Sequence, residues 1–442
     1  MHKLTHAVSA LLCVDSRVYM CRRAPQLSVQ PGHTVFPCGK IDAAARAKPA
    51  DGGIHGLPGH AASTLQRELL RETGLDLAAA LHSGLVRGLT PYASLETPQS
   101  IPQHLRVDYI RVDLAAMPEL RLAPAQALDG AWRKADDWLR RYADGELLMA
   151  PPTLEVLQRL AADGAPGLFP QSGLHLPPFE TLAGVRQFYV PSHTLPPATT
   201  TNCFLLGDAD GRRILVDPSP KSRKVLDELL AAAAPIGFDE VFLTHHHQDH
   251  RQYANEIALR YGVPIGLSAY TEARLRQSKP TFFDGVTTRH YREGDRVCHW
   301  RGEPVRVIEM PGHDEGQLGL MPDSRAWCLV GDLIQGIGSV VISPPEGNMQ
   351  RYFASLQRLI ELQPRTIFPS HGDGMGTVFR LEQTLARRRT REAEVLRLSE
   401  LGQSPDDMLQ TLYPQLPSDL KTFARVQIDS HLEKLRAEGR VA

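Results

Sequence analysis

Residues 244–250, Thr-His-His-His-Gln-Asp-His, place four histidines and an aspartate within six consecutive positions. They follow the apolar run 241–243, which predicts a buried strand. Because side chains alternate along a strand, we expect His245, His247 and Asp249 to point the same way, with the last histidine swung in by the following turn. Imidazole and carboxylate groups suit a borderline metal such as zinc, with iron and manganese as alternatives.

Three further apolar runs downstream each end in a turn of small residues that offers one ligand. The turns are Pro311-Gly312-His313, Gly331-Asp332 and Pro369-Ser370-His371-Gly372. Glycine and proline at such turns let the backbone bend sharply after a strand. Metal-ligand residue types thus follow four apolar runs in order along the chain. This pattern favours a metal site over an exposed run of histidines.

This ordered set of ligands resembles the metallo-β-lactamase superfamily of hydrolases over roughly residues 186–382. The resemblance implies a four-layer αβ/βα sandwich with two metals at one edge. Asp217 then corresponds to a supporting aspartate that is not a ligand. The resemblance implies that the first metal is held by His245, His247 and His313. It implies that the second is held by Asp249, His250 and His371, and that Asp332 bridges both metals.

The implied ligand set also predicts a chemistry. Two cations about 3.5–4 Å apart can hold a bridging hydroxide that attacks a carbonyl carbon or phosphorus, and they stabilise the developing oxyanion. Asp249 is the residue we expect to accept or relay a proton. In the superfamily, thioesterase-like and nuclease-like members have a bridging aspartate such as Asp332, whereas true β-lactamases generally lack one. The resemblance therefore does not imply antibiotic hydrolysis.

An N-terminal segment resembles a second family. Residues 65–75, Leu-Gln-Arg-Glu-Leu-Leu-Arg-Glu-Thr-Gly-Leu, are similar to the Nudix box, and Glu68 and Glu72 lie four apart on one helix face where they could share Mg²⁺. Arg71 stands where the box has a glutamate, and an insertion at about 43–63 splits the glycine loop from the helix. We expect a degenerate domain used for recognition or packing; the alternative is an active pyrophosphohydrolase.

The C-terminal residues form a third block. A basic run at 387–391 is followed by a helical pattern and by Gly439-Arg440-Val441, and a helix before a short strand is typical of a small winged-helix module. Acidic and basic residues nearly balance here, so the basic run is weak evidence for nucleic acid. With Pro344-Pro345-Glu346-Gly347, this half resembles the β-lactamase-like protein 2 family, some of whose members are single-strand endoribonucleases.

Composition sets outer bounds on these interpretations. The chain has 442 residues, too many for one ordinary core, and its net charge of −1 excludes a global basic field. Six scattered cysteines without a CxxC pair predict buried thiols in a reducing cytoplasm. The apolar run at 7–14 is short and soon followed by charge, which favours a strand over a signal peptide. No apolar run approaches the roughly 20 residues that span a bilayer.

We therefore expect an α/β and α+β multidomain protein: a Nudix-like domain at 1–162, a Gly- and Pro-rich linker at 163–185, a metallo-β-lactamase fold at 186–384 and a winged-helix-like module at 385–442. The expected function is dinuclear metal-dependent hydrolysis of a small thioester or of single-stranded RNA. The alternatives are a Nudix pyrophosphohydrolase of nucleotide or coenzyme A derivatives, and a nucleotide-sensing binding module. The sequence carries no signal for an oligomeric state.

Overall fold

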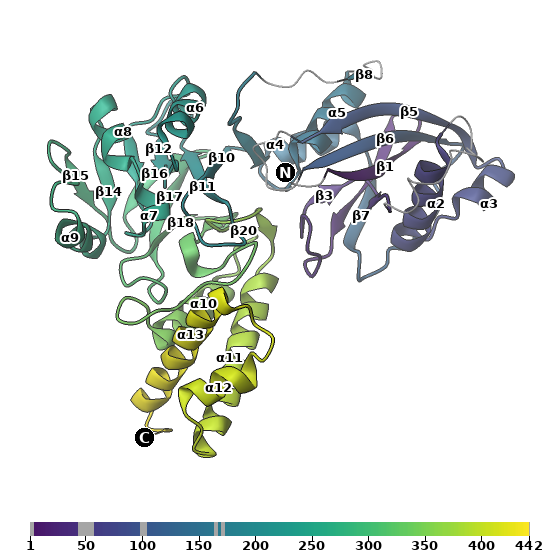
Figure 1. Ribbon diagram of the computed structural model, residues 1–442. Coiled ribbons are helices and arrows are strands. Elements are labelled where there is room, and N and C mark those ends of the chain that lie inside the picture. The colour runs from purple at the N-terminus through teal and green to yellow at the C-terminus, as the bar shows by residue number, and fades with distance from the viewer. Residues whose placement is uncertain (1–3, 43–56, 98–103, 163–166, 169–172, 442) are drawn as a thin grey trace. The chain divides into compact units, whose positions relative to one another are not determined.

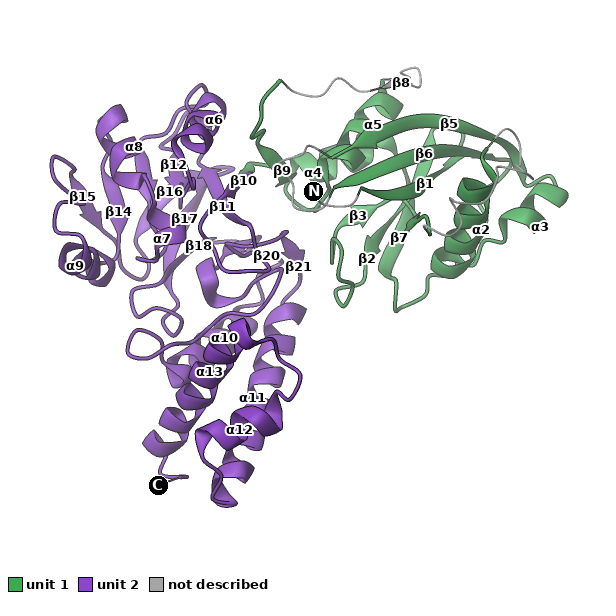
Figure 2. Ribbon diagram, in the orientation of Figure 1, with its two compact units in different colours: residues 1–186 green, residues 187–442 purple. Residues whose placement is uncertain are grey.

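The chain divides into two compact units, residues 1–186 and 187–442 (Figure 2). The computed structural model describes residues 4–42, 57–97, 104–162, 167–168 and 173–441. The larger part of the expected insertion, 43–56, and part of the expected linker lie outside the described residues. Within the described part of the chain, no helix is long and apolar enough to cross a membrane.

The N-terminal unit is built on a mixed sheet of the order β3-β2-β1-β6-β5-β8, with β4 paired to β1 and β7 paired to β2 (Figure 1). The strands are β1 (Thr5–Val14), β2 (Arg17–Arg23), β3 (Thr34–Val35), β4 (Cys38–Lys40), β5 (Val86–Glu96), β6 (Leu105–Leu114), β7 (Ala127–Lys134) and β8 (Gly167–Leu168). The apolar run near the N-terminus is therefore a strand, as expected, and it pairs in parallel with β6.

Helices pack on both faces of this sheet, which explains why β1 is apolar along most of its length. Val8, Ala10 and Leu12 face one core together with α2 (Gly59–Thr73) and α3 (Leu77–His82). Leu11 and Cys13 face the opposite core with α4 (Ala135–Ala143) and α5 (Pro151–Ala161). The period of two along a strand thus sends alternate side chains into two separate layers.

The C-terminal unit contains two sheets packed face to face. The first has the order β15-β14-β13-β12-β11-β10-β9, in which β9 and the first residues of β10 precede residue 187, and the second has the order β16-β17-β18-β19-β20-β21. Phe204 of the first sheet meets Phe368 of the second with ring centroids 5.8 Å apart. The strands are β9 (Phe179–Leu182), β10 (Val185–Pro191), β11 (Thr200–Leu206), β12 (Ile214–Val216), β13 (Glu240–Phe242), β14 (Ile265–Leu267), β15 (Thr288–His290), β16 (Arg296–Trp300), β17 (Glu303–Glu309), β18 (Leu318–Pro322), β19 (Cys328–Leu329), β20 (Thr366–Phe368) and β21 (Met375–Gly376).

Helices cover the outer faces of these sheets, which confirms the expected αβ/βα sandwich. Helix α8 packs on β13 and β14, and α10 packs on the second sheet through Tyr352, Leu356 and Leu359. The helices of the sandwich are α6 (Arg223–Ala233), α7 (Gln248–Arg251), α8 (Ala254–Tyr261), α9 (Ala269–Ser278) and α10 (Met349–Leu362), with the short 3₁₀ helix η1 (Gly331–Leu333).

Three helices end the chain: α11 (Phe379–Glu400), α12 (Pro405–Leu412) and α13 (Ser418–Ala437). The first turns of α11 belong to the sandwich core, and its last turns join α12 and α13 in a small apolar core of their own. The expected strand at Gly439-Arg440-Val441 is wrong. The amides of Gly439 and Arg440 instead bond back to Arg436 and Leu435 carbonyls, so these residues close the end of α13.

Candidate metal site

The histidine-rich segment is not the continuation of a strand, so the expectation that its side chains alternate was wrong in detail. Strand β13 ends at Phe242, because the amide of Thr244 donates to the carboxylate of Asp217 at 2.8 Å and not to a neighbouring strand. Residues 245–247 then form a bend, and residues 248–251 form α7. The ligands are therefore aimed by a loop and a single helical turn.

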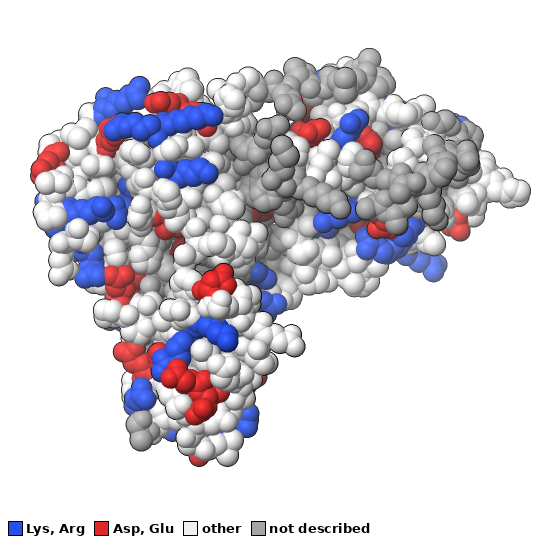
Figure 3. Space-filling model, viewed as in Figure 1, with Lys and Arg blue, Asp and Glu red and all other residues white. Residues whose placement is uncertain are grey.

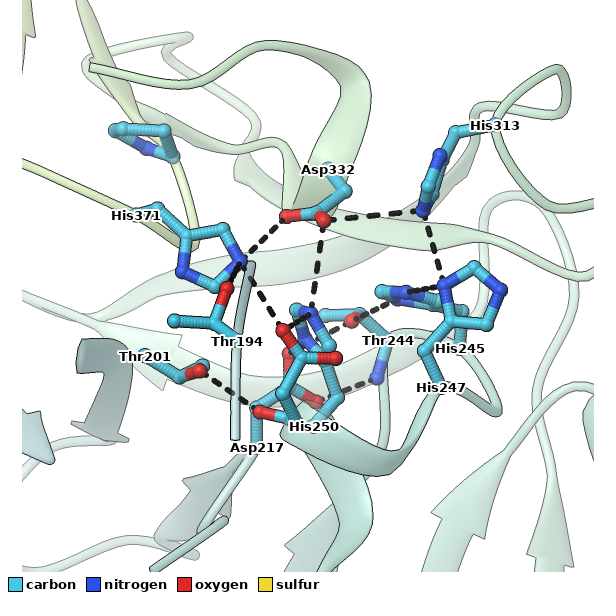
Figure 4. Close-up of polar contacts among 12 residues, drawn as sticks. Thr194, Thr201, Asp217, Thr244, His245, His247, His250, His313, Asp332 and His371 are labelled. Atoms are coloured by element: carbon cyan, nitrogen blue, oxygen red, sulfur yellow. Dashed lines mark hydrogen bonds and ion pairs between the residues drawn. The ribbon is translucent and has the colours of Figure 1, made fainter. Parts of the chain in front are cut away.

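The structure nevertheless brings all seven predicted residues together from strand ends and the turns that follow them. Figure 4 shows the labelled histidine rings and Asp332 facing a common centre. The contributing segments are the loop after β13 (His245, His247), α7 (Asp249, His250), the turn after β17 (His313), η1 after β19 (Asp332) and the turn after β20 (His371). Residues separated by more than 120 positions thus share one site.

Three histidines converge through one nitrogen each. The Nδ1 of His247 lies 3.0 Å from the Nε2 of His245 and 3.0 Å from the Nε2 of His313. Ligand atoms of these three residues all lie within 4.8 Å of one another. This spacing matches nitrogens arranged around a single metal ion, whose bonds to nitrogen are about 2.0–2.1 Å for zinc.

A second group, Asp249, His250 and His371, lies beside the first and meets the same spacing criterion. Asp332 stands between the two groups. Its Oδ2 is 3.7 Å from the Nε2 of both His313 and His250, and its Oδ1 is 3.4 Å from the Nε2 of His371. A carboxylate with its two oxygens directed to both groups is placed to bridge two cations.

Hydrogen bonds on the far side of each ring hold these nitrogens in place. Outside the site, His313 Nδ1 donates to the carbonyl of Val341 and His371 Nδ1 donates to that of Thr200, both at 2.9 Å. His250 Nδ1 lies 2.9 Å from Asp217. Assigning the ring proton to the bonded nitrogen leaves the lone pair of the other nitrogen directed into the site.

A further observation shows that these residues suit divalent metal binding. Among the described residues, the buried Nε2 of His250 and the buried Oδ1 of Asp332 have no hydrogen-bond partner. A polar atom left unsatisfied in a buried position is costly. A cation accepting these lone pairs would satisfy both atoms, since imidazole and carboxylate are ligands that zinc and similar metals take.

Electrostatics divide the site into two halves. Burial lowers the pKa of His245 well below its usual range and that of His313 to about 4, and neighbouring histidines add to both shifts. Burial also opposes charge on His250 and His371, yet the surrounding carboxylates outweigh it and raise both pKa values. Around Asp332, burial is outweighed by these two histidines, and its pKa is well below the usual range. Metal binding would therefore displace protons mainly from His250 and His371, and not from His245 and His313.

Several residues that support the site were not singled out as functional by the sequence. Glu346 lies 3.5 Å from the Nε2 of His247 and 3.3 Å from that of His246, and it forms an ion pair with Arg274. Thr194 Oγ1 lies 3.5 Å from the Nε2 of His371. Glu346 follows two prolines, but only its tertiary neighbours reveal that it stands behind a ligand.

The carboxylate pair of the N-terminal unit has a different environment. Glu68 and Glu72 are both buried on α2, and Gly74 caps this helix in the left-handed conformation. Arg71 forms an ion pair with Glu68 and lies 3.6 Å from Glu72. Arg67 adds a second ion pair to Glu68 at 2.9 Å. Two guanidinium groups thus already neutralise the carboxylates that could share Mg²⁺.

Comparison with known proteins gives the class of this chain. The model of the metallo-beta-lactamase superfamily matches residues 196–371, and that of the beta-lactamase associated winged helix domain matches residues 404–442. With the fold and the convergent ligands, these matches identify a metallo-beta-lactamase domain followed by a beta-lactamase associated winged helix domain, and they indicate a metal-dependent hydrolase.

Two relatives are similar to this chain over about half of its length or less. A beta-lactamase-like protein 2 homolog from Drosophila melanogaster is 27% identical over 259 residues, which cover 54% of this chain and 84% of the relative. A hydroxyacylglutathione hydrolase from Fuscovulum blasticum is 34% identical over 181 residues, which cover 41% of this chain and 65% of the relative. The second match therefore spans just under two thirds of its relative.

Two solved structures are similar to parts of the chain. A beta-lactamase domain protein from Burkholderia ambifaria is 23% identical with a TM-score of 0.49, covering 59% of this chain and 88% of that chain. A NUDIX hydrolase from Alicyclobacillus acidocaldarius is 24% identical with a TM-score of 0.31, covering 37% of this chain and 93% of that chain.

Proposed function

We propose that this chain is a dinuclear metal-dependent hydrolase whose substrate is a small thioester. The observation that carries the proposal is the pair of ligand groups with Asp332 between them, because one carboxylate then serves two cations. We expect zinc in both positions, with iron and manganese as alternatives for the same nitrogen and oxygen ligands. Bound there, the metals would supply an activated water nucleophile and electrostatic stabilisation of negative charge on the substrate.

The protein's own residues prepare this chemistry. His245, His247 and His313 would hold one metal, and Asp249, His250 and His371 the other. The Asp249 side chain is 18% exposed, whereas His250 and His371 are fully buried, so Asp249 is the acidic ligand open to substrate and solvent. A carboxylate in that position is suited to take up a proton as the nucleophile attacks and to return it to the leaving group.

The surroundings of the site support a thioester over a phosphodiester. A nucleic-acid backbone is bound through cations along a groove. Three basic residues of this unit already have partners within the protein: Arg251 donates to the carbonyl of His246, Arg223 pairs with Glu256, and Lys224 lies 3.9 Å from Glu228. On the face seen in Figure 3, acidic and basic side chains also intermingle over the C-terminal helices.

Two exposed apolar residues follow residues that contact His371. Leu195 follows Thr194, which contacts His371, and it is 53% exposed. Ile337, 37% exposed, follows Gly336, whose amide donates to the His371 carbonyl at 2.8 Å. Exposed apolar residues on two loops beside one ligand suit an apolar part of a substrate better than a phosphate.

The relatives point the same way. The hydroxyacylglutathione hydrolases among them are named for a thioester substrate. The Nudix alternative is not favoured, because Arg67 and Arg71 occupy the carboxylates that would bind Mg²⁺. We therefore place catalysis in the C-terminal unit.

The proposal is tested with the purified, metal-loaded chain. A hydroxyacylglutathione thioester, a coenzyme A thioester, single-stranded RNA and a nucleoside diphosphate derivative are offered separately, and product is followed by thiol release or chromatography. We expect thioester hydrolysis that a chelator abolishes and added zinc restores. Cleavage of RNA alone, or activity that survives complete metal removal, would overturn the proposal.

A further inference from the structure

Residues 340–342 connect the metal site to the C-terminal helices. The carbonyl of Val341 accepts the hydrogen bond from His313 Nδ1 at 2.9 Å, so this segment sets the orientation of a ligand ring. Val340 and Ile342, on either side, are buried in the core that also contains Tyr352. A shift of this segment would therefore be transmitted directly to the imidazole of His313.

The C-terminal helices hold the carbonyls on both sides of Val341. Arg388 of α11 donates to the carbonyl of Val340. From α13, Gln427 Nε2 donates to the carbonyl of Ile342 at 3.0 Å, and Ser430 Oγ donates to the same oxygen at 2.6 Å. Arg388 also donates to the side chain of Gln427, which joins the two helices at this point.

Arg388 reaches the site by a second route. Its guanidinium lies over the ring of Tyr352, 5.6 Å from the centroid. Tyr352 donates to the carbonyl of Leu333, the residue after Asp332, at 2.8 Å. The backbone of Tyr352 also packs against Gly312, the residue before His313, so closely that a Cβ there would lie 2.3 Å from its Cα.

We propose that Arg388, Gln427 and Ser430 are positioning residues for the metal site. The C-terminal helices clamp residues 340–342 and Tyr352, and through them they set His313 and Asp332. Helices α11 and α13 would thus help to set the geometry of the metal site. This inference rests on the proposed dinuclear site.

The hydrogen bonds of this clamp satisfy a buried carbonyl oxygen. Gln427 and Ser430 are both buried, as is the Ile342 carbonyl they share, so their donors compensate an oxygen that water does not reach. Losing the outer partner of a ligand ring typically lowers metal affinity or activity about 10–100-fold. Arg388 bonds to the residue next to Val341 and not to the ligand ring's own partner. We therefore expect its removal to lower metal affinity by about tenfold, the low end of this range.

Cobalt binding to the full chain tests the clamp, because Co²⁺ absorption reports ligand geometry independently of activity. Arg388→Ala is compared with wild type and with Arg389→Ala, an exposed neighbour on the same helix whose side chain donates to Gln357. We expect Arg388→Ala to bind cobalt about tenfold more weakly, with altered visible absorption and a lower kcat at similar KM. Arg388→Lys should restore part of each property, and Arg389→Ala should match wild type.

Ser430→Ala provides a second variant if Arg388→Ala does not fold, since it removes one donor to Ile342 and little volume. The clamp is overturned if the folded variants bind cobalt with the affinity and absorption of wild type. A general loss of stability with unchanged cobalt absorption also overturns it, because that result marks a merely structural role. Wild-type chain that takes up no cobalt would overturn the proposed function, and this inference with it.

Discussion

Replacing Asp217 with asparagine should disturb one half of the metal site. This aspartate is almost fully buried and is not one of the seven predicted ligands. Its Oδ2 accepts from Thr244 Oγ1 at 2.7 Å and from His250 Nδ1 at 2.9 Å, and its Oδ1 accepts from the Thr244 amide at 2.8 Å. It therefore holds both the end of β13 and the ring of a ligand.

The magnitude follows from the chemistry of the amide. In Asp217→Asn the oxygen can remain opposite the Thr244 amide, so the NH₂ group replaces the oxygen that faces His250. Two donors then meet, unless the ring proton moves to the Nε2 that faces Asp332. A hydrogen bond to a charged partner contributes about 1.5–3 kcal/mol, which corresponds to about 10–100-fold in binding.

The assay is metal competition against a chromophoric chelator, with metal content measured by elemental analysis. Asp217→Asn should lose about 10–100-fold in affinity at the second site. The first site should change less, because its ligand His245 is linked to Asp217 through Thr244 and not directly. Asp323→Asn is the matched control, since this half-exposed aspartate pairs with Arg306 at the surface. Unchanged affinity at both sites in Asp217→Asn would refute the reasoning about ring orientation.

Further predictions concern both units. Two ligand groups with Asp332 between them predict about two metals per metal-supplemented chain, and elemental analysis finding only traces would contradict them. Asp249→Ala should abolish hydrolysis of the main substrate, whereas the Glu68→Gln/Glu72→Gln double variant should retain it; the reverse pattern in steady-state assays would place catalysis in the N-terminal unit. Arg71→Glu should raise Mg²⁺ affinity because it removes the ion pair to Glu68 and adds a carboxylate, and equal affinity in a titration would reject that cause. Burial raises the pKa of Glu72 from 4.5 to about 7. The folded state therefore binds more protons than the unfolded state in this interval, and stability should fall by up to about 3 kcal/mol as pH rises from 4.5 to 7. Unfolding across this range should show a smaller pH-dependent loss for Glu72→Gln, and equal slopes would count against a buried, proton-binding carboxyl.

The sequence carries enough local information to predict the architecture of the C-terminal unit. Apolar runs ending in small-residue turns identify the strands before His313, Asp332 and His371, and the structure has strands in those places. The same is true of β1, whose apolar pattern fits a strand buried on both faces. These inferences succeed because side-chain period and turn residues act over a few neighbouring positions.

Predictions that needed an exact backbone path or a distant partner were less complete. The strand expected to continue through the histidines stops at Phe242, and the amide of Thr244, two residues further on, donates to Asp217 and not to a neighbouring strand. The strand expected at Gly439-Arg440-Val441 is the closure of α13, because bonds back to the helix satisfy its amides. In both cases a competing hydrogen bond decided between two conformations that the local residues allow.

The amino-acid sequence by itself determined which residue types end each strand and in what order, since those are properties of short segments. Only the tertiary structure decided which nitrogen of each histidine faces the site, that Asp332 lies between two ligand groups, and that Arg388 supports the segment behind His313. These depend on distances of a few ångströms between residues far apart in the chain. Such distances are set by the packing of the two sheets and the helices around them, and a linear pattern does not encode them one residue at a time.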